Sequence, residues 1–383
     1  MNGNLLIKNG VLVGPNGSRA ADILVKDGLI EEISADIQPE NEVQVLDVKG
    51  KTVMPSFADM HVHLRDPGFT YKEDLESGIK AAVNGGFTHI TAMGNTNPAP
   101  DNLEVLSDIL SRAKALNLAD VYQVATVTKG LNGKEAVDFA ELRKLTQFFS
   151  DDGKNVDNEE IFARAMRASG ELDFKVLDHS EPETEMVIRN IKIAKQERGN
   201  LHFCHISRKE SMLAIMQAKD EGINVTVEVT PHHLFGWDLD YRVAPPFAAK
   251  DDADFLLRAV GSGYVDCIST DHAPHTAEDK AKGMNGISGL DVAFSIINTV
   301  FAEEGYSLSL LSRLMSLNPM RFMRVNSGVL MTGKEANLVI VDPDATYTIN
   351  PDNFVSKGKN TPFAGREVAG KVIHTIKKGV ILK

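Results

Sequence analysis

The strongest constraint on the fold is an alternation that runs through the middle of the chain. Short apolar runs rich in β-branched residues are separated by longer amphipathic stretches. Eight such runs occur, at residues 52–60, 88–93, 121–127, 145–150, 174–177, 201–204, 224–229 and 264–269. Strands that alternate with helices are typical of parallel sheets, and eight of them predict a (β/α)8 barrel.

The stretches between these runs have the spacing of amphipathic helices, which we expect at residues 72–83, 135–144, 159–168, 185–196 and 209–219. In the last stretch, Met212, Ile215 and Met216 fall on one helical face, and core packing accounts for them without a cofactor. The alternating segments span about residues 52–317, which fits the roughly 250 residues of a (β/α)8 barrel.

Both ends of the chain have a different pattern, with short strands separated by turn sequences such as Asn-Gly and Asp-Gly. Strands are expected at residues 5–7, 11–13, 21–26, 29–33, 44–47, 337–341, 345–349, 371–377 and 380–382. Because chain termini often lie close together, the two ends can form one small domain. The predicted organisation is an α/β chain with a barrel at residues 52–325 and a composite β-sandwich from residues 1–51 and 326–383.

The 41 lysines and arginines and 53 aspartates and glutamates give a formal net charge of −12. This argues against a protein built to bind nucleic acid, whereas an anionic small molecule needs only a local cation. Cys204 and Cys267, the only cysteines, lie in apolar runs and indicate free thiols in a reducing compartment. Because the sequence has no signal-peptide pattern and no run of about 18 apolar residues, we expect a soluble cytoplasmic protein without a membrane segment.

Most of the histidines directly follow the predicted barrel strands. Eight of the eleven are at such positions, namely His61, His63, His179, His205, His232, His233, His272 and His275. Carboxylates occur at the same ends, in Asp151-Asp152 after the fourth run and at Asp271 after the eighth. Because the C-terminal ends of barrel strands meet at one face, where barrel enzymes keep their active sites, the pattern predicts one polar site there.

The pair His61 and His63 indicates a metal site. Residues two apart on a strand point to the same side, so both imidazoles can grip one divalent ion. His179, His205 and two carboxylates on neighbouring strands add four donors, which is more than one tetrahedral ion needs. We therefore predict a two-metal site that makes hydroxide available, with zinc as the expected metal and cobalt or manganese as alternatives. For His232–His233 we expect a packing or supporting role.

Asp271 and Arg65 have the strongest candidate roles in catalysis and binding. A carboxylate beside a metal hydroxide can serve both as a ligand and as a proton shuttle, and the alternative for Asp271 is a helix N-cap. Arg65 follows the histidine pair and suits a substrate carboxylate, which it can bind through two hydrogen bonds. The alternative for Arg65 is a surface salt bridge with Asp66 or Glu73.

Seven motifs, in order, resemble those of the amidohydrolase superfamily and, within it, the bacterial type of dihydroorotase. They are HVHLRDPG, NTNP, FSDDG, DHSEP, CHIS, EVTPHHL and STDHAPH. Many members of the superfamily bridge their metals with a carboxylated lysine on the fourth strand, where this chain has Asp151 and Asp152. The resemblance covers the whole chain and matches the β-rich ends to the family's composite β-sandwich.

The resemblance implies a metal-dependent cyclic amide hydrolase that interconverts N-carbamoyl-L-aspartate and L-dihydroorotate in pyrimidine synthesis. It implies that a metal-bound hydroxide attacks the ring amide and that Asp271 carries the proton to the leaving nitrogen. It also implies two zinc ions, one held by His61, His63 and Asp271 and the other by His179 and His205. Asp152 would lie between the two ions, with Asp151 as the other candidate for that position. The residues that the resemblance assigns to the substrate are Arg65, Asn95, His275 and Gly286.

Some positions differ from the family pattern and motivate alternatives. Ala244 stands before Pro245-Pro246 where the family usually has Asn, and the segments after Glu181 and His275 are short. The second hypothesis is therefore a cyclic amidase for hydantoin, allantoin or a dihydropyrimidine. The third is a catalytically silent scaffold for another pyrimidine enzyme. The expected partners are a small anionic substrate, a second copy in a homodimer and an associated pyrimidine enzyme, with no nucleic acid and no membrane.

Overall fold

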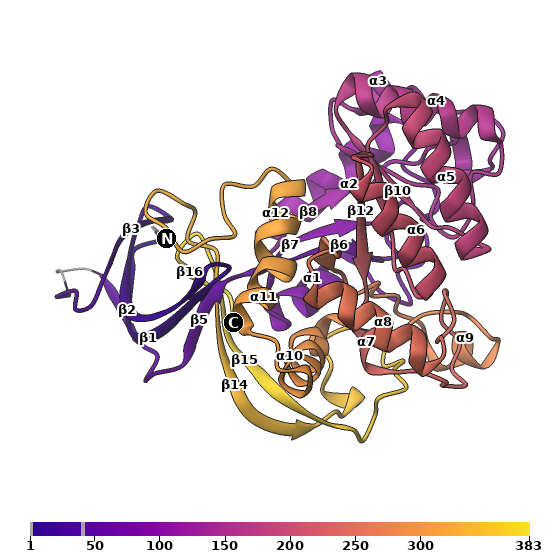
Figure 1. Ribbon diagram of the computed structural model, residues 1–383. Helices are drawn as coiled ribbons and strands as arrows, with labels where there is room; N and C mark the ends of the chain where they lie inside the picture. Colours follow the sequence, from indigo (N-terminus) through magenta and orange to yellow (C-terminus); the bar gives the residue numbers. More distant parts are fainter. Residues whose placement is uncertain (1–2, 40–42) are drawn as a thin grey trace.

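The computed structural model describes residues 3–39 and 43–383, and its central part is the predicted barrel (Figure 1). The strands form two parallel groups, which are β6 (Phe57–Val62), β7 (Phe87–Ala92) and β8 (Asp120–Gln123), and then β9 (Phe148–Phe149), β10 (Lys175–Asp178), β11 (Leu201–Phe203), β12 (Val225–Val229) and β13 (Cys267–Ile268). Parallel bridges from Ala125 to Phe149 and from Val62 to His272 join the groups at both edges. The eight strands β6–β13 therefore close into a barrel, which confirms the predicted fold class.

Helices cover the outside of the barrel (Figure 1). The longer ones are α1 (Leu75–Asn84), α2 (Leu103–Ala115), α4 (Glu159–Leu172), α5 (Glu183–Glu197), α6 (Lys209–Asp220), α8 (Lys250–Gly261) and α10 (Ala293–Glu304). The shorter ones are α3 (Phe139–Leu142), α7 (Pro231–Phe235), α9 (Ala277–Ala281), α11 (Leu308–Ser312) and α12 (Asn318–Phe322). Among the described residues, no helix is long and apolar enough to cross a membrane.

The helix predicted at residues 135–144 is only the single turn α3. Ala136 pairs with Thr128 in an antiparallel bridge, and the N–H of Val137 donates to the carbonyl of Val127. These bonds hold the first part of the predicted segment in a loop, and Asp138 then caps the short helix by accepting from the N–H of Glu141. Tertiary pairing has overridden the local helical spacing here.

The two ends of the chain build one sheet beside the barrel (Figure 1). Its strands are β1 (Leu5–Gly14), β2 (Gly17–Lys26), β3 (Leu29–Ser34), β4 (Gln44–Asp47), β5 (Thr52–Pro55), β14 (Leu338–Thr348), β15 (Glu367–Lys377) and β16 (Val380–Ile381). Strand β5 pairs with β1 on one side and with β14 on the other. This pairing joins the N-terminal and C-terminal contributions into a composite sheet.

At three places the chain is divided into strands differently from the prediction. The run at residues 52–60 is two strands, because β5 belongs to the terminal sheet and the barrel begins only at β6. The Asn9-Gly10 pair is a bulge inside β1 and no turn, since Asn9 has a left-handed backbone (φ 59°) and its N–H donates to Asp22 at 2.8 Å. Strand β14 likewise continues through the Asp342–Thr346 register shift, so two predicted strands merge.

Separate apolar cores stabilise the barrel and the terminal sheet. Phe57 is fully buried and its ring lies 5.7 Å from that of Phe87 and 5.5 Å from that of Phe294, which links barrel strands to helix α10. The terminal sheet encloses a second cluster that includes Ile7 and Leu338. Burying a side chain of this size stabilises the folded state by about 1.5–3 kcal/mol.

A third apolar cluster, in which Met60, Phe148 and Leu177 are fully buried, joins residues of the barrel strands to residues of α12. Both cysteines, Cys204 and Cys267, belong to this cluster as buried free thiols. The cluster excludes water from this part of the barrel, so polar chemistry is confined to the strands' C-terminal ends.

Candidate metal and active site

The polar residues predicted at the strand ends come together in the structure. His61 lies on β6, and the other five predicted ligands follow the C-terminal ends of β6, β9, β10, β11 and β13. All six side chains are buried, namely His61, His63, Asp152, His179, His205 and Asp271. They form a compact cluster, which we call the donor cluster.

One half of the donor cluster is built around Asp271. Its Oδ1 atom lies 3.1 Å from Nε2 of His63 and 3.4 Å from Nε2 of His61. Two imidazoles and a carboxylate that converge in this way form a group able to hold a metal ion. Asp271 does not cap a helix, because Thr276 caps the following helix α9.

The other half is built around Asp152, whose carboxylate spans two histidines. Oδ1 lies 3.3 Å from Nε2 of His179, and Oδ2 lies 3.3 Å from Nδ1 of His63. The neighbouring Asp151 points elsewhere, since its Oδ1 accepts the N–H groups of Val127 and Thr128 at 2.8 and 3.0 Å. Of the two candidates left open by the sequence, Asp152 is the one that faces the cluster.

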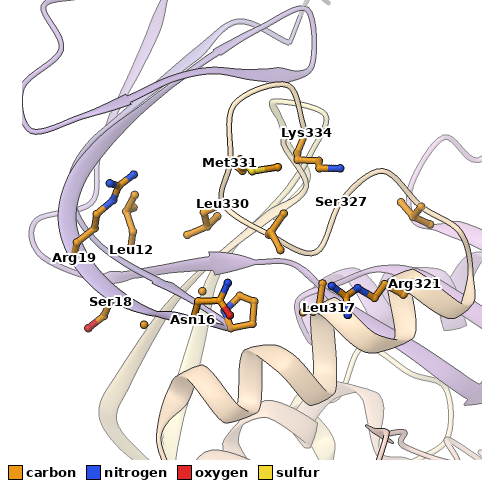
Figure 2. Close-up of a pocket in the computed structure, with 15 residues that line it drawn as sticks. Leu12, Asn16, Ser18, Arg19, Leu317, Arg321, Ser327, Leu330, Met331 and Lys334 are labelled. Atoms are coloured by element: carbon orange, nitrogen blue, oxygen red, sulfur yellow. The ribbon is translucent and has the colours of Figure 1, made fainter. Parts of the chain in front are cut away.

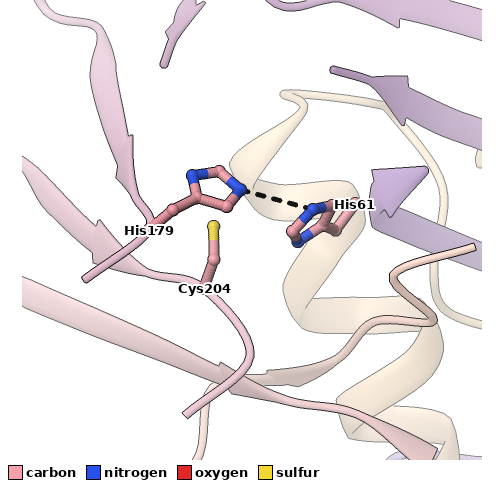
Figure 3. Close-up of side chains that lie close together, drawn as sticks. All are labelled: His61, His179 and Cys204. Atoms are coloured by element: carbon pink, nitrogen blue, oxygen red, sulfur yellow. Dashed lines mark hydrogen bonds between the residues drawn. The ribbon is translucent and has the colours of Figure 1, made fainter. Parts of the chain in front are cut away.

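Cys204 lies close to two histidines of the donor cluster, His61 and His179 (Figure 3). The Nε2 atoms of His179 and His61 are 3.3 Å apart. The ring of His205 lies 5.0 Å from that of His179 and 5.2 Å from that of His61. Burial raises the pKa of the Cys204 thiol well above its ordinary value, so this sulfur is a neutral thiol in the barrel.

Glu228 is a residue of the site that the sequence interpretation missed. It is fully buried on β12, where one carboxylate oxygen lies 2.8 Å from Nδ1 of His61 and the other 3.2 Å from Nε2 of His202. The sequence feature that could have identified Glu228 is its place as the first residue of the EVTPHHL motif, directly before the end of a predicted strand. By engaging Nδ1, Glu228 leaves Nε2 of His61 directed into the donor cluster.

The adjacent pair His232–His233 lies outside the donor cluster. Both rings are buried, and Nε2 of His233 is 3.0 Å from the carbonyl oxygen of Pro245. His232 packs with its ring 4.3 Å from His233 and 5.9 Å from Phe247. These contacts are those of packed side chains.

The electrostatics of the cluster suit cations. Burial lowers the pKa of His63 to about 3 and holds those of His179 and His205 well below the ordinary value, so these rings are neutral and have lone pairs to donate. Burial also raises the pKa of Asp271 to about 7, although the His61 ring opposes it. Burial alone would lower the pKa of His61, but Asp271 and Glu228 outweigh it and raise the value to about 10.

Three residues of the site have left-handed backbone conformations that non-glycine residues rarely adopt. The φ angles are 59° for Arg65, 37° for His205 and 45° for Asp271. Each such residue costs about 1–3 kcal/mol, and the surrounding fold must supply that energy. The sharp turns at the strand ends are what direct these side chains to the site.

A cavity of about 490 Å³ opens beside the donor cluster. Its lining includes His63, Asp152, His205 and Asp271 together with the four predicted substrate-binding residues, Arg65, Asn95, His275 and Gly286. A smaller cavity of about 230 Å³ adjoins it and shares Asp152, His205 and Ala244. The structure therefore brings the predicted substrate-binding residues and the donor cluster to one place.

Arg65 faces this cavity instead of forming a surface salt bridge. Its Nη2 atom lies 3.2 Å from Nε2 of His275, and its Nε–H donates to the carbonyl of Pro274 at 3.4 Å. The two carboxylates that were alternatives have other partners, since Asp66 pairs with Arg112 at 2.8 Å and Glu73 lies 3.4 Å from His272.

Asn95 has a more specific position than the sequence suggested. Its side-chain oxygen lies 3.0 Å from Nδ1 of His63, and its amide nitrogen donates to Oδ2 of Asp152 at 3.1 Å. Asn95 therefore orients two members of the donor cluster while it lines the cavity.

Two further residues, one that lines the cavity and one that bonds its lining, were not found from the sequence. Lys72 lines the cavity with a buried ammonium group. The sequence feature that could have identified it is a cation a few residues after the pair His61 and His63. Asn360 comes from the C-terminal segment, accepts the N–H of His275 at 2.9 Å and donates to the carbonyls of Ala273 and Gly286. Nothing in the local sequence around Asn360 indicates this role.

A larger cavity lies elsewhere, between the terminal sheet and α12 (Figure 2). It measures about 640 Å³, and Arg19, Arg321 and Lys334 are its charged residues. The described residues that line it include no histidine and no carboxylate, so it lacks metal ligands. The donor cluster, unlike this cavity, offers histidines and carboxylates that can bind a metal ion.

The donor cluster passes a chemical test for a metal pair. Imidazoles and carboxylates are ligands that zinc, cobalt and manganese accept, and the cluster offers four of the former and two of the latter. His63, His179 and His205 are neutral, and His61, whose pKa is raised, would release its proton when it binds a metal ion. Buried carboxylates also need compensating positive charge, which divalent cations would supply. The residues present therefore fit the metal dependence typical of amidohydrolases.

Comparisons with known proteins give a consistent result. A family model described as Dihydro-orotase-like matches residues 50–186, and one described as Amidohydrolase family matches residues 165–382. The curated dihydroorotase of Clostridium botulinum is 43% identical over 393 residues, with 98% of each chain covered. The curated dihydroorotase of Aquifex aeolicus is 36% identical over 414 residues, again with 98% of each chain covered.

Solved structures show the same fold at lower identity. An L-hydantoinase from Arthrobacter aurescens is 24% identical with a TM-score of 0.87, and the match covers 100% of this chain and 96% of that one. A dihydropyrimidinase from Brevibacillus agri is 21% identical with a TM-score of 0.87, and the match covers 99% and 95%.

Proposed function

The chain belongs to the dihydroorotases of the amidohydrolase family, and from this membership we propose that it interconverts L-dihydroorotate and N-carbamoyl-L-aspartate. The observation that carries the proposal is the cavity in which the donor cluster meets Arg65 and His275. The donor cluster can hold metal ions and therefore suits hydrolysis of the scissile ring amide. The side of the cavity that contains Arg65 suits a substrate carboxylate. The reaction belongs to pyrimidine synthesis, and the two buried free thiols support a cytoplasmic location.

We assign two zinc ions to the donor cluster. His61, His63 and Asp271 would hold one ion, His179 and His205 would hold the other, and Asp152 would contact both. The support is that Asp152 lies between His63 and His179, one from each group. Divalent cations bound there would polarise the ring carbonyl and make water more acidic.

Asp271 is the residue to which we assign the proton transfer. In ring opening, water adds to the amide carbon, the carbon–nitrogen bond breaks and the ring nitrogen needs a proton. Oδ1 of Asp271 lies against the imidazoles of the donor cluster and also lines the cavity, so it can take the proton from water and deliver it to nitrogen. Ring closure follows the same path in reverse.

The substrate carboxylate is assigned to Arg65 and His275, with Asn95 and Gly286 beside them. Arg65 can donate two parallel hydrogen bonds to a carboxylate. Gly286 has φ 143°, and a Cβ atom there would lie 2.5 Å from the carbonyl oxygen of Ala273, so only glycine fits at this point of the lining.

The competing assignment is a cyclic amidase that acts on neutral rings. The observation in its favour is that Ala244, which lines both adjoining cavities, cannot form a side-chain hydrogen bond to the substrate. The cations Arg65 and Lys72 favour an anionic substrate instead. Rates of the metal-loaded protein on dihydroorotate, dihydrouracil, hydantoin and allantoin separate the two, and faster turnover of any neutral ring would reject our assignment.

The primary experiment is turnover of dihydroorotate and of carbamoyl aspartate by zinc-loaded protein, with metal content measured on the same sample. We expect activity in both directions and its loss by about three orders of magnitude or more in Asp271→Ala. Asp291→Ala, which removes a carboxylate that only bonds Asn84, Val355 and Ser356, is the matched control. Absence of turnover in fully metal-loaded protein would refute the assignment, and absence of any bound metal would favour the scaffold hypothesis.

A further inference from the structure

His272 directly follows Asp271 in the STDHAPH motif, and the proposed chemistry gives it no role. Its ring is fully buried and is not part of the lining of the cavity beside the donor cluster. Any effect of this ring on the reaction must therefore pass through its neighbours. A buried imidazole also needs hydrogen-bond partners, and those partners indicate what His272 holds in place.

The two ring nitrogens of His272 have partners of opposite kinds. Nδ1 accepts the backbone N–H groups of Gly289 and Leu290 at 3.1 and 3.4 Å. An imidazole with a lone pair on Nδ1 is neutral and carries its proton on Nε2. Nε2 lies 3.4 Å from Oε2 of Glu73, a carboxylate oxygen that can accept this proton in a hydrogen bond. Because all these contacts agree with one tautomer, the ring is fixed in one orientation.

Glu73 is as deeply buried as His272 and connects it to a distant part of the chain. The hydroxyl of Ser356 donates to Oε2 of Glu73, and the N–H of Lys357 donates to Oε1 at 3.2 Å. Burial alone would raise the pKa of Glu73, but hydrogen bonds from His272 and Ser356 outweigh it and lower the pKa. Glu73 is therefore a fixed carboxylate acceptor, held by the segment between β14 and β15.

The backbone of His272 links the ends of two barrel strands at the donor cluster. Its carbonyl accepts the N–H of His63 at 2.8 Å, and its own N–H donates to the hydroxyl oxygen of Thr270 at 3.0 Å. Asp271, directly before it, has the left-handed φ of 45°. A conformation of this kind persists only where the surrounding structure holds it. A shift of His272 would therefore also move the carboxylate of Asp271.

We propose that His272 is a positioning residue that directs the Asp271 carboxylate into the donor cluster. The hydrogen bond from Nε2 of His272 to Glu73 anchors the turn in which Asp271 has its strained backbone. Oδ1 of Asp271 is thereby kept 3.1 Å from Nε2 of His63. The inference rests on the proposed function, in which Asp271 holds a metal ion and transfers the proton. It adds a residue that acts on the reaction only through another side chain.

Two substitutions of His272 retain different halves of the ring's hydrogen bonding. The amide nitrogen of Gln can take the place of Nε2, so His272→Gln keeps a donor for Glu73. Asn is one methylene shorter, so His272→Asn keeps an acceptor for Gly289 but has no donor that reaches Glu73. In zinc-saturated protein we expect His272→Asn to lower kcat for dihydroorotate about tenfold or more, with KM changed less than about threefold.

The comparison of these two variants is the first decisive result. We expect His272→Gln to keep kcat within about threefold of the wild-type value, because the anchor to Glu73 is retained. Equal kcat values for His272→Gln and His272→Asn would overturn the proposal.

Zinc affinity tests the positioning without turnover. Asp271 is an assigned ligand, so a misdirected carboxylate should weaken zinc binding. Titration of zinc-loaded protein with a chromogenic chelator should show about tenfold weaker binding in His272→Asn than in the wild type. In an Asp271→Ala background, the same substitution should change the affinity less than about twofold, because the side chain that it directs is absent. An equal loss in both backgrounds, or no loss in either, would overturn the proposal.

Glu73→Met removes the acceptor from the other side of the hydrogen bond. We expect it to lower kcat and zinc affinity as His272→Asn does, and the double variant to be no worse than the poorer single variant. Losses that add in the double variant would show two independent effects and would contradict the anchor. The His272 variants decide the question alone if Glu73→Met does not fold.

The matched control is the same substitution at another buried ring. His89 lies on β7, outside the donor cluster and the lining of its cavity. We expect His89→Asn to keep kcat and zinc affinity within about twofold of the wild-type values. Losses as large as those of His272→Asn would show that removing any buried histidine harms the enzyme, and would count against a specific role of His272.

The two levels of inference fail separately. Wild-type protein that turns over dihydroorotate, with a His272→Asn variant of unchanged kcat and zinc affinity, would refute the role of His272 and leave the function intact. Wild-type protein without any turnover would refute the function, while the zinc affinities would still decide whether His272 directs Asp271.

Discussion

Nδ1 of His61 lies 2.8 Å from Oε1 of Glu228, which is 167 residues away in the chain, and both side chains are fully buried. The second oxygen of the same carboxylate lies 3.2 Å from Nε2 of His202. Burial alone would raise the pKa of Glu228, but the two rings outweigh it and hold the pKa well below its usual range. A permanent carboxylate behind His61 therefore orients that ring toward the donor cluster.

We expect Glu228→Gln to weaken metal binding about 10- to 100-fold, because an amide cannot accept from both rings. Competition with a chromogenic chelator measures this affinity directly. Glu183→Gln is the matched control, since Glu183 only accepts from Ser207 and Arg208 outside the cluster. Equal metal affinities of the Glu228→Gln variant and the wild type would contradict the orienting role.

The adjacent residues Asp151 and Asp152 should respond to substitution in opposite ways. Asp152→Asn removes a charged donor between His63 and His179, so we expect a lower metal content and loss of activity with little change in stability. Asp151→Asn disturbs hydrogen bonds to Val127 and Thr128, so we expect a loss of about 1–3 kcal/mol in the free energy of unfolding with metal retained.

Elemental analysis and chemical denaturation of both variants check this pair of expectations. The assignment of Asp152 as the bridging donor would be wrong if Asp151→Asn, and not Asp152→Asn, lost the metal.

We expect the buried ring of His89 to cause part of the pH dependence of the free energy of unfolding. Its ring is buried on β7, and burial lowers its pKa to about 4 from 6.5, against the opposing effect of Asp120. As the pH falls, His89 binds a proton in the unfolded chain before it does so in the folded protein. The contribution of this ring to the free energy of unfolding is therefore complete above pH 6.5 and is lost as the pH falls toward 4. The loss amounts to about 3 kcal/mol at most.

Denaturation curves between about pH 4 and pH 7 should therefore be less steeply pH-dependent for His89→Gln than for the wild type. His374→Gln, at a half-buried ring on β15, is the matched control substitution. Parallel profiles for the wild type and His89→Gln would show that this buried ring does not control acid sensitivity.

Asn360 should couple the stability of the cavity wall to substrate affinity. Its side chain makes hydrogen bonds to the N–H of His275, the hydroxyl of Ser288 and the carbonyls of Ala273 and Gly286. Asn360→Ala removes these hydrogen bonds, and only the carbonyl of Gly286 keeps another donor, Lys280. We therefore expect a loss of about 2–4 kcal/mol in unfolding free energy and a higher KM. The exposed helix cap Asn350→Ala should cost only about 1 kcal/mol and leave the KM unchanged. Denaturation and steady-state kinetics measure both effects, and an unchanged KM in Asn360→Ala would show that the wall tolerates its loss.

Much of the fold was predictable because the barrel has a strong local signature. Each buried strand is a short β-branched run, and each helix between strands has one apolar face, so the alternation is visible residue by residue. The failures were local. The Asn9-Gly10 pair has the sequence of a turn, but the hydrogen bond from Asn9 to Asp22 on the neighbouring strand makes it a bulge.

The sequence by itself determined which polar residues come together, because residues that follow barrel strands must meet at one face whatever the details of packing. His61, His63, His179, His205 and Asp271 were identifiable on that ground alone. Only the tertiary structure decided which neighbour of a pair faces the site and which distant side chains support it. Asp152 is directed inward because Asp151 bonds the backbone after β8. Glu228 and Asn360 acquire their roles only through contacts with His61 and His275, from which they are separated by 167 and 85 residues. Such roles depend on distances in space, which local sequence patterns do not contain.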